Sequence, residues 1–146
     1  MALGRILSST DISASGLAAE RLRMETVANN IANAHSTRTA DGGPYRRRQV
    51  VFSSVLDSAA GLSTGTHTGL KGVQVVGIEA SNAELPRVFN PSHPDADADG
   101  FLLMPNISVP EEMVDLITAS RAYDANLKAL RSFRQMVEQS LSLLRS

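Results

Sequence analysis

The chain of 146 residues contains no cysteine and no tryptophan, and aromatic residues make up only 4% of it. Without cysteine, disulfide bonds, thiolate nucleophiles and thiolate metal ligands are excluded. So low an aromatic content is unusual for an enzyme, because catalytic pockets and enzyme cores usually depend on aromatic rings. The hydrophobic fraction of 42% is nevertheless high enough to form a packed core in one domain.

The sequence also lacks a strong net charge and a long hydrophobic run. The formal net charge is -1, so no overall field attracts nucleic acid or an acidic membrane. No run approaches the roughly 18 apolar residues that span a bilayer, so we expect no direct membrane insertion. Ser8, Ser9, Thr10 and Asp11 interrupt the apolar residues after Arg5, unlike the pattern of a Sec-type signal peptide. We therefore expect any export from the cytoplasm to use another route.

The C-terminal third carries a hydrophobic stripe whose spacing alternates between three and four residues without a slip. Its members are Met113, Leu116, Ser120, Tyr123, Leu127, Leu130, Arg134, Val137, Leu141 and Leu144. A repeat of about 3.5 residues keeps one edge of a helix against a partner helix, as in a coiled coil. The sequence therefore predicts a helix over 111–145, roughly 50 Å long at about 1.5 Å per residue. Ser108 or Val109 suits its cap, Pro110 its first turn, and acidic residues follow.

The N-terminal segment predicts a second helix, from Asp11 to Asn33, with Thr10 or Asp11 as its cap. Its stripe is weaker and consists of Ser13, Leu17, Glu20, Met24, Val27, Ile31 and Ala34. Small residues from Ser13 to Ala19 would let another helix approach closely. A short amphipathic helix that docks on the long one explains the pattern equally well.

The middle of the chain reads as an irregular insert with short strands. Asp41 to Pro44 is a strong turn signal, and the alternation over 45–52 is typical of a strand. The Gly, Ser and Thr residues between Asp57 and Gly72 predict a flexible loop or a hairpin tip.

A second strand is expected from Val73 to Ile78, after that loop. Five prolines exclude a helix between Leu85 and Pro110, although Gly100 to Met104 is expected to be extended.

The predicted fold is therefore mainly α, with long N- and C-terminal helices that pair as a coiled coil. We expect 1–34 and 108–146 to form one discontinuous helical domain, with 35–107 as a β-containing and loop-containing insert. Because the N-terminal helix is shorter than its partner, part of the long stripe stays uncovered. Exposed apolar strips mark partner surfaces, so we expect association through the terminal helices.

The segment Asp95 to Gly100 is the most tempting site for chemistry, because alternate aspartates precede a glycine as in an EF-hand loop. The twelfth position of such a loop is Asn106 here, not the required glutamate. Prolines also stand where the entering helix belongs. We favour an acidic Asx turn over a calcium site, and we expect no cofactor.

The other polar clusters do not assemble a catalytic pattern. In a strand, the run Arg46-Arg47-Arg48 points to opposite faces, which favours solvated or ion-paired arginines over a phosphate site. His35, His67 and His93 lie in predicted loops without metal-ligand spacing. No nucleophile elbow or phosphate loop supports an enzyme.

Several stretches, in order over almost the whole chain, resemble the flagellar basal-body rod proteins of bacteria, specifically a proximal rod subunit. These are 22–34, 43–48 with 50–52, 90–100 with 104–106, and 112–117 with 120–126. The residues of the shared motifs are Asn29, Asn30, Asn33, Arg121, Tyr123 and Asn126.

The resemblance implies a structural subunit that leaves the cytoplasm through the flagellar type III apparatus. Its helices would pack into a periplasm-spanning rod with copies of itself, other rod subunits and membrane-ring or adaptor proteins at the rod base. The assembly stripe is expected to include Leu17, Met24, Val27, Ile31, Met113, Leu116, Tyr123, Leu127, Leu130, Val137, Leu141 and Leu144. Phe52 and Leu56 resemble an element that the export gate recognises in related substrates.

Two other functions stay open on the residues alone. A cytoplasmic coiled-coil adaptor would form a closed dimer or tetramer that never fractionates with basal bodies. A metal-dependent enzyme built on the aspartate-rich loop would bind calcium or magnesium tightly.

Overall fold

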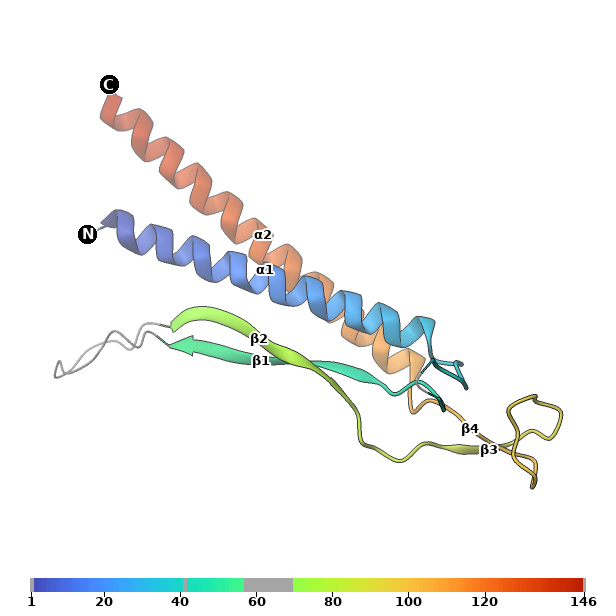
Figure 1. The fold of residues 1–146 in the computed structure, drawn as a ribbon. Helices are drawn as coiled ribbons and strands as arrows, with labels where there is room; N and C mark the ends of the chain where they lie inside the picture. The colour runs from blue at the N-terminus through green and yellow to red at the C-terminus, as the bar shows by residue number, and fades with distance from the viewer. Residues whose placement is uncertain (1, 41, 57–69, 146) are drawn as a thin grey trace. The chain divides into compact units, whose positions relative to one another are not determined.

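The computed structural model describes residues 2–40, 42–56 and 70–145 of the chain (Figure 1). In chain order, its elements are α1 (Ala2–Ala32), β1 (Arg48–Leu56), β2 (Leu70–Ala80), β3 (Arg87–Phe89), β4 (Phe101–Leu103) and α2 (Val109–Arg145). The helices contain 31 and 37 residues, whereas the longest strand has 11. The prediction of a mainly α chain with a small β-containing insert is thus confirmed.

The start of α1 differs from the sequence prediction, which placed it at Asp11 with Thr10 or Asp11 as the cap. The helix already begins at Ala2 and continues through both residues. A residue that can cap a helix does not have to end one, because Thr or Asp inside a helix costs less than about 1 kcal/mol. The segment before Asp11 contains no proline to stop the helix.

The start of α2 agrees with the prediction. The helix begins at Val109, and the Ser108 carbonyl accepts the Glu112 N–H at 3.0 Å. Pro110 lacks an N–H at a position where a helix has no acceptor for one, and acidic residues in the first turn face the positive end of the helix dipole. No helix among residues 2–40 or 109–145 has a window apolar enough to cross a membrane.

Within the described residues, the β structure consists of two separate two-stranded sheets. In one, β1 pairs with β2; the predicted strand at 73–78 lies within β2, and the one at 45–52 overlaps β1 from Arg48 onward, with 45–47 preceding the strand. In the other, β3 and β4 are antiparallel, with Arg87 opposite Leu103 and Phe89 opposite Phe101. The extended segment expected after Gly100 is therefore confirmed. The predicted loop from Asp57 to Gly72 lies outside the described residues up to position 69, as does His67.

The chain divides into two compact units. Unit 1 comprises Met1–Leu22, Val51–Gly77 and Ala119–Ser146, and unit 2 comprises Arg23–Val50 and Ile78–Thr118. The boundary between the units crosses α1 after Leu22 and α2 after Thr118, so each helix contributes to both units. The division expected from sequence, 1–34 with 108–146 against 35–107, stays a prediction, as does the coiled-coil pairing.

Small side chains pack within unit 1. Ser13, Ala19 and Ala119 are buried. A Cβ built on Gly16 would lie 3.0 Å from Nδ2 of Asn126, so α1 approaches α2 closely at this point. The close approach expected of the small-residue segment is therefore confirmed at Gly16.

Candidate functional site

The side chain of Asn30, in unit 2, has no exposed surface and is held by four hydrogen bonds. Its Nδ2 donates to the Arg48 carbonyl at 2.8 Å and to Oε2 of Glu112 at 3.0 Å. Its Oδ1 accepts the Tyr45 hydroxyl at 3.1 Å and the Arg48 N–H at 2.9 Å. An amide side chain has two donors and two lone pairs, so Asn30 is fully satisfied. It ties the end of α1 to β1, to the segment before β1 and to α2.

Glu112 extends this network to Arg47, which also contacts Asp115. Its carboxylate is 1% exposed, and its Oε1 accepts a hydrogen bond from Nε of Arg47 at 2.5 Å. Nη2 of Arg47 lies 3.3 Å from Oδ2 of Asp115. Nη2 of Arg23 lies 3.5 Å from Oδ1 of the same carboxylate. A buried carboxylate is tolerated only when charge and hydrogen bonds compensate for lost water, and here Arg47 and Asn30 supply both.

Tyr45 closes the network on the side of the loop before β1. Its N–H donates to the Ser36 carbonyl at 3.0 Å, while its hydroxyl holds Asn30. Burial raises the pKa of the Tyr45 phenol above its ordinary value, because water no longer stabilises the phenolate; nearby Arg48 opposes this rise, and Glu112 adds to it. The phenol therefore remains a hydrogen-bond donor at neutral pH.

The two neighbouring asparagines of the motif differ from Asn30 in what they do. Asn33 ends α1: its N–H and its Nδ2 both donate to the Asn29 carbonyl, at 3.1 and 2.9 Å, and its Oδ1 accepts the Ser36 hydroxyl. The side chain of Asn29 is exposed. The motif therefore combines a buried connector, a helix terminator and a surface position.

The aspartate-rich loop forms the expected Asx turn. Asp97 Oδ1 accepts the N–H groups of Asp99 at 3.1 Å and Phe101 at 2.8 Å, and its other oxygen pairs with Arg87. These contacts, led by the Phe101 N–H, lower the pKa of the Asp97 carboxyl. Gly100 has φ of 78°, a left-handed conformation that favours glycine in such a turn. Across the described residues, no group of three possible metal ligands gathers here or elsewhere.

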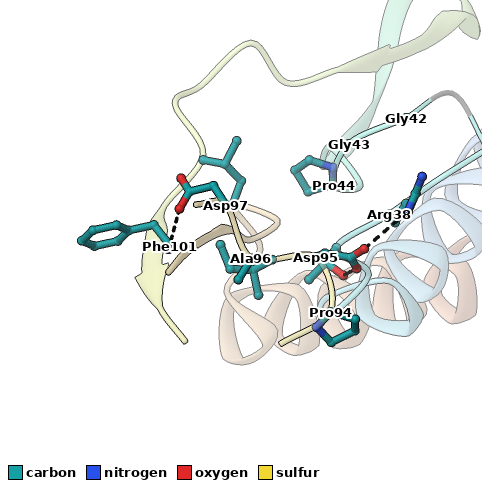
Figure 2. A pocket seen from close by; sticks show the side chains of 12 residues that line it. Arg38, Gly42, Gly43, Pro44, Pro94, Asp95, Ala96, Asp97 and Phe101 are labelled. Carbon is teal, nitrogen blue, oxygen red and sulfur yellow. Dashed lines mark hydrogen bonds and ion pairs between the residues drawn. The ribbon is translucent and has the colours of Figure 1, made fainter. Parts of the chain in front are cut away.

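A cavity of ≈ 460 Å³ lies between this turn and the loop before β1. Figure 2 shows Arg38 facing Asp95 across one side of it, while the Phe101 ring points away. Asp95 accepts the Thr37 hydroxyl at 2.8 Å and lies 3.7 Å from Arg38. These contacts join the two loops, so the acidic residues serve structure within unit 2.

The apolar stripe predicted on α2 is only partly buried. Glu112 and Ala119 are buried, whereas Met113, one position later than Glu112, is 53% exposed. Among the side chains of α2 up to position 143, the exposed large apolar ones are Met113, Val114, Ile117, Met136, Leu141 and Leu143. Leu116, Tyr123, Leu127, Leu130 and Val137 are half-buried, as are Leu17, Met24 and Ile31 on α1, while Val27 is buried. Leu144 lies in α2, but its side chain is outside the described part. The role of these residues in assembly stays a prediction.

The remaining residues expected from the sequence occupy separate places. Arg121 is exposed, and Asn126 is the residue that Gly16 approaches. Phe52, on β1, is 37% exposed, and Leu56 is the last residue of that strand. Recognition of Phe52 and Leu56 by an export gate stays a prediction.

Sequence reasoning missed Glu112, Arg47 and Tyr45 as site residues. The sequence pattern places Glu112 only among the acidic residues that follow Pro110, and it predicts Arg47 as a solvated or ion-paired arginine of a strand. The ion pair is confirmed, although Arg47 precedes β1. Glu112 directly precedes Met113, the first residue of the hydrophobic stripe. This position of an acidic residue beside apolar ones is the only sequence feature that could have indicated its burial.

Two models of protein families match this chain, one near its N-terminus and one near its C-terminus. The family model described as "Flagella basal body rod protein" matches residues 11–38. The model described as "Flagellar basal body rod FlgEFG protein C-terminal" matches residues 98–143. These segments include α1 from Asp11 onward, β4 and most of α2.

Relatives match over nearly the full length. The flagellar basal-body rod protein FlgC of Borreliella burgdorferi is 37% identical, with 95% of this chain and 97% of the relative covered. FlgC of Salmonella typhimurium is 41% identical over 94% of this chain and 97% of its own. FlgC of Bacillus subtilis is 35% identical over 92% and 95%.

Proposed function

The chain belongs to the family of flagellar basal-body rod proteins named FlgC, and it is a structural rod subunit, not an enzyme. On this basis we propose a route by which it reaches the rod and a way in which it assembles there. It leaves the cytoplasm through the flagellar type III apparatus, with Phe52 and Leu56 contacting the export gate. It then packs with other rod proteins and copies of itself in the periplasm, beside membrane-ring or adaptor proteins at the rod base.

The observation that best supports assembly by helix packing is the exposed apolar surface of α2. Met113, Val114 and Ile117 occupy neighbouring positions on the helix and are each more than half exposed. An isolated protein rarely leaves so many large apolar side chains together in water, and contiguous apolar patches commonly mark contacts with other proteins. The half-buried members of the stripe, Leu127 and Leu130 among them, are proposed to complete these contacts.

The shape of a rod follows from the kind of contact. Heterologous contacts between subunits, when the rotation does not close, give helical tubes instead of rings. Torque then passes through packed side chains and needs no chemistry. The fully satisfied network around Asn30 fits such a role, because a buried polar network with every partner in place holds its elements in one arrangement.

The deciding experiment is an in-frame deletion in the source bacterium, examined by electron microscopy. Loss of rods, hooks and filaments, restored by the wild-type gene, is the expected result. A strain that keeps motile flagella, with no second copy of the gene, would refute the rod assignment. Appearance of the complementing protein in the periplasm of a rod-deficient strain tests the export step separately.

A further inference from the structure

The short sheet of β3 and β4 presents an exposed aromatic face. Alternate residues along a strand share a face, so Arg87 and Phe89 lie beside Leu103 and Phe101 of the facing strand. Phe89 is 64% exposed and Leu103 is 44% exposed, whereas Leu102, on the opposite face, is buried.

The aromatic face is held in one arrangement by contacts within unit 2. The two phenylalanine rings meet edge to face with centroids 5.4 Å apart. The Arg87 guanidinium lies 4.8 Å from the Phe101 ring centroid and pairs with Asp97. Two of the four phenylalanines in a chain poor in aromatics are thus gathered on one exposed and ordered surface. Aromatic residues and arginine are the types that contribute most to protein interfaces.

A hollow of ≈ 490 Å³ lies at the start of α2, also within unit 2. Its lining combines two apolar residues, Pro110 and Val114, with three charged ones, Arg47, Glu111 and Asp115. Arg47 is fixed there by Glu112 and Asp115, so its guanidinium plane is already oriented. An arginine in a fixed position at the edge of an apolar hollow is suited to an aromatic ring, which it attracts through the ring's π electrons.

We propose that the Phe89 face of one copy docks in the Pro110–Val114 hollow of a second copy. The chain carries both halves of the contact: an aromatic face with a cation beside it, and an apolar hollow with exposed Glu111 on its rim. Docking brings Arg87 toward Glu111, so the charges are complementary, and it places Phe89 against Val114 and Arg47. Because the two surfaces differ, the contact is heterologous and can repeat without closing.

The size of the contact predicts when it forms. Two aromatic side chains bury at most a few hundred Å² between them, on the order of 150–250 Å² each. That is well below the roughly 1,200 Å² typical of a stable complex. The contact is therefore weak between free subunits and becomes stable only when other contacts in the assembly hold the copies together. The proposal rests on the chain being a rod subunit that assembles with copies of itself.

Cysteine cross-linking tests the contact directly, because the natural chain has no cysteine. Cells are made to express one copy carrying Phe89→Cys and another carrying Val114→Cys, and isolated basal bodies are oxidised. A band at twice the subunit mass is expected with the two variants together and not with either alone. The matched control replaces Phe89→Cys by Glu84→Cys, an exposed position outside the aromatic face.

The outcomes separate this inference from the proposed function. Variants that enter basal bodies but give no dimer band overturn the inference and leave the rod assignment intact. Absence of a tagged wild-type chain from basal bodies refutes the rod assignment itself. A Phe89→Cys band that contains a different protein shows that the occupant is not a second copy, and so also overturns the proposal.

A second test needs no cross-link. Phe89→Ser is expected to reduce incorporation into rods, whereas Val88→Ser, on the opposite strand face, is not. Because Phe89→Ser also removes the ring contact with Phe101, urea unfolding of both variants is measured as well, and incorporation is compared at equal amounts of folded subunit. Equal incorporation of the two variants would contradict the proposal.

Discussion

At the scale of single residues, Asn30 has no exposed surface and makes four hydrogen bonds. Its partners come from the segment around β1 and from α2, which lie far from it in sequence. An asparagine at the end of a helix is usually read as a terminator, and that reading suits Asn33. The difference between the two comes from burial: an unpaired polar group costs little in water and much in a packed interior.

Asn30→Ala should destabilise the subunit by about 3 kcal/mol, because it removes a hydrogen-bond partner from the buried side chains of Tyr45 and Glu112 and two further bonds to the Arg48 backbone. Urea unfolding followed by circular dichroism measures this change. The matched control is Asn29→Ala, whose exposed side chain should contribute less than about 0.5 kcal/mol. Equal effects of the two substitutions would show that the network does not stabilise the subunit.

Asp97 supplies a pH-dependent prediction. Its pKa is lowered below the ordinary 3.8 in the folded state, mainly by the Phe101 N–H. A lowered folded pKa means that the stabilisation is complete above 3.8 and is lost as pH falls through the folded value. The amide resonances of Asp99 and Phe101 should therefore shift with a midpoint below pH 3.8. Asp97→Asn should abolish this transition; a midpoint at or above 3.8 in the wild type would contradict the turn geometry.

At the scale of elements, the turn between β3 and β4 depends on Gly100. A Cβ at this position would lie 3.0 Å from a ring carbon of Phe89 and 3.1 Å from Pro91, in addition to the cost of its left-handed conformation. Gly43 has a similar φ of 81° but no neighbour within 4 Å of such a Cβ.

Gly100→Ala should therefore destabilise unit 2 more than Gly43→Ala. The control has only the conformational cost, of about 1 kcal/mol, whereas Gly100→Ala adds a steric conflict that displaces Phe89. Urea midpoints of the two variants measure the difference. Identical midpoints would mean that the aromatic face moves aside freely.

For α2, the prediction concerns assembly. Leu127→Asp places a charge on a half-buried position of the predicted stripe, and burial of an unpaired carboxylate in a helix contact is strongly unfavourable. We expect rods to remain incomplete and cells non-motile. Motility at normal protein level would count against the stripe. Lys128→Asp, at the next and exposed position, is the control for a mere change of charge.

At the scale of the whole molecule, the two units are stabilised by different kinds of contact. Unit 2 contains the network of Asn30, Tyr45, Arg47 and Glu112. In unit 1, the buried side chains within the described part of α1 and α2 are small, namely Ser13, Ala19 and Ala119. Small side chains contribute little hydrophobic stabilisation, since the effect scales with buried apolar area.

Hydrogen exchange of the dilute free subunit should reflect this difference. Amides of 10–22 in α1 are expected to exchange faster than those of 24–32, although both belong to one helix. Incorporation into the rod should slow the first group, because neighbouring subunits then cover it. Uniform protection along α1 in the free subunit would show that unit 1 needs no neighbours.

The sequence by itself determined the kinds of element and most of their order. The stripe from Met113 to Leu144 specified a long helix, Ser108 to Glu112 its start, and Asp97 with Gly100 the Asx turn. These features depend on residues close together in the chain, where periodicity, capping and turn conformation act locally. The resemblance to rod proteins likewise came from short motifs.

Only the tertiary structure decided which polar residues are buried and which apolar residues are exposed. Glu112 and Met113 are adjacent, yet the carboxylate is enclosed and the thioether side chain is more than half exposed. Hydrophobicity predicts the reverse order. The outcome depends on Asn30 and Arg47, which are distant in sequence and supply the hydrogen bonds and charge that make burial of Glu112 tolerable. A local sequence pattern does not specify partners that are distant in the chain, so the burial of Glu112 is determined only by the folded structure.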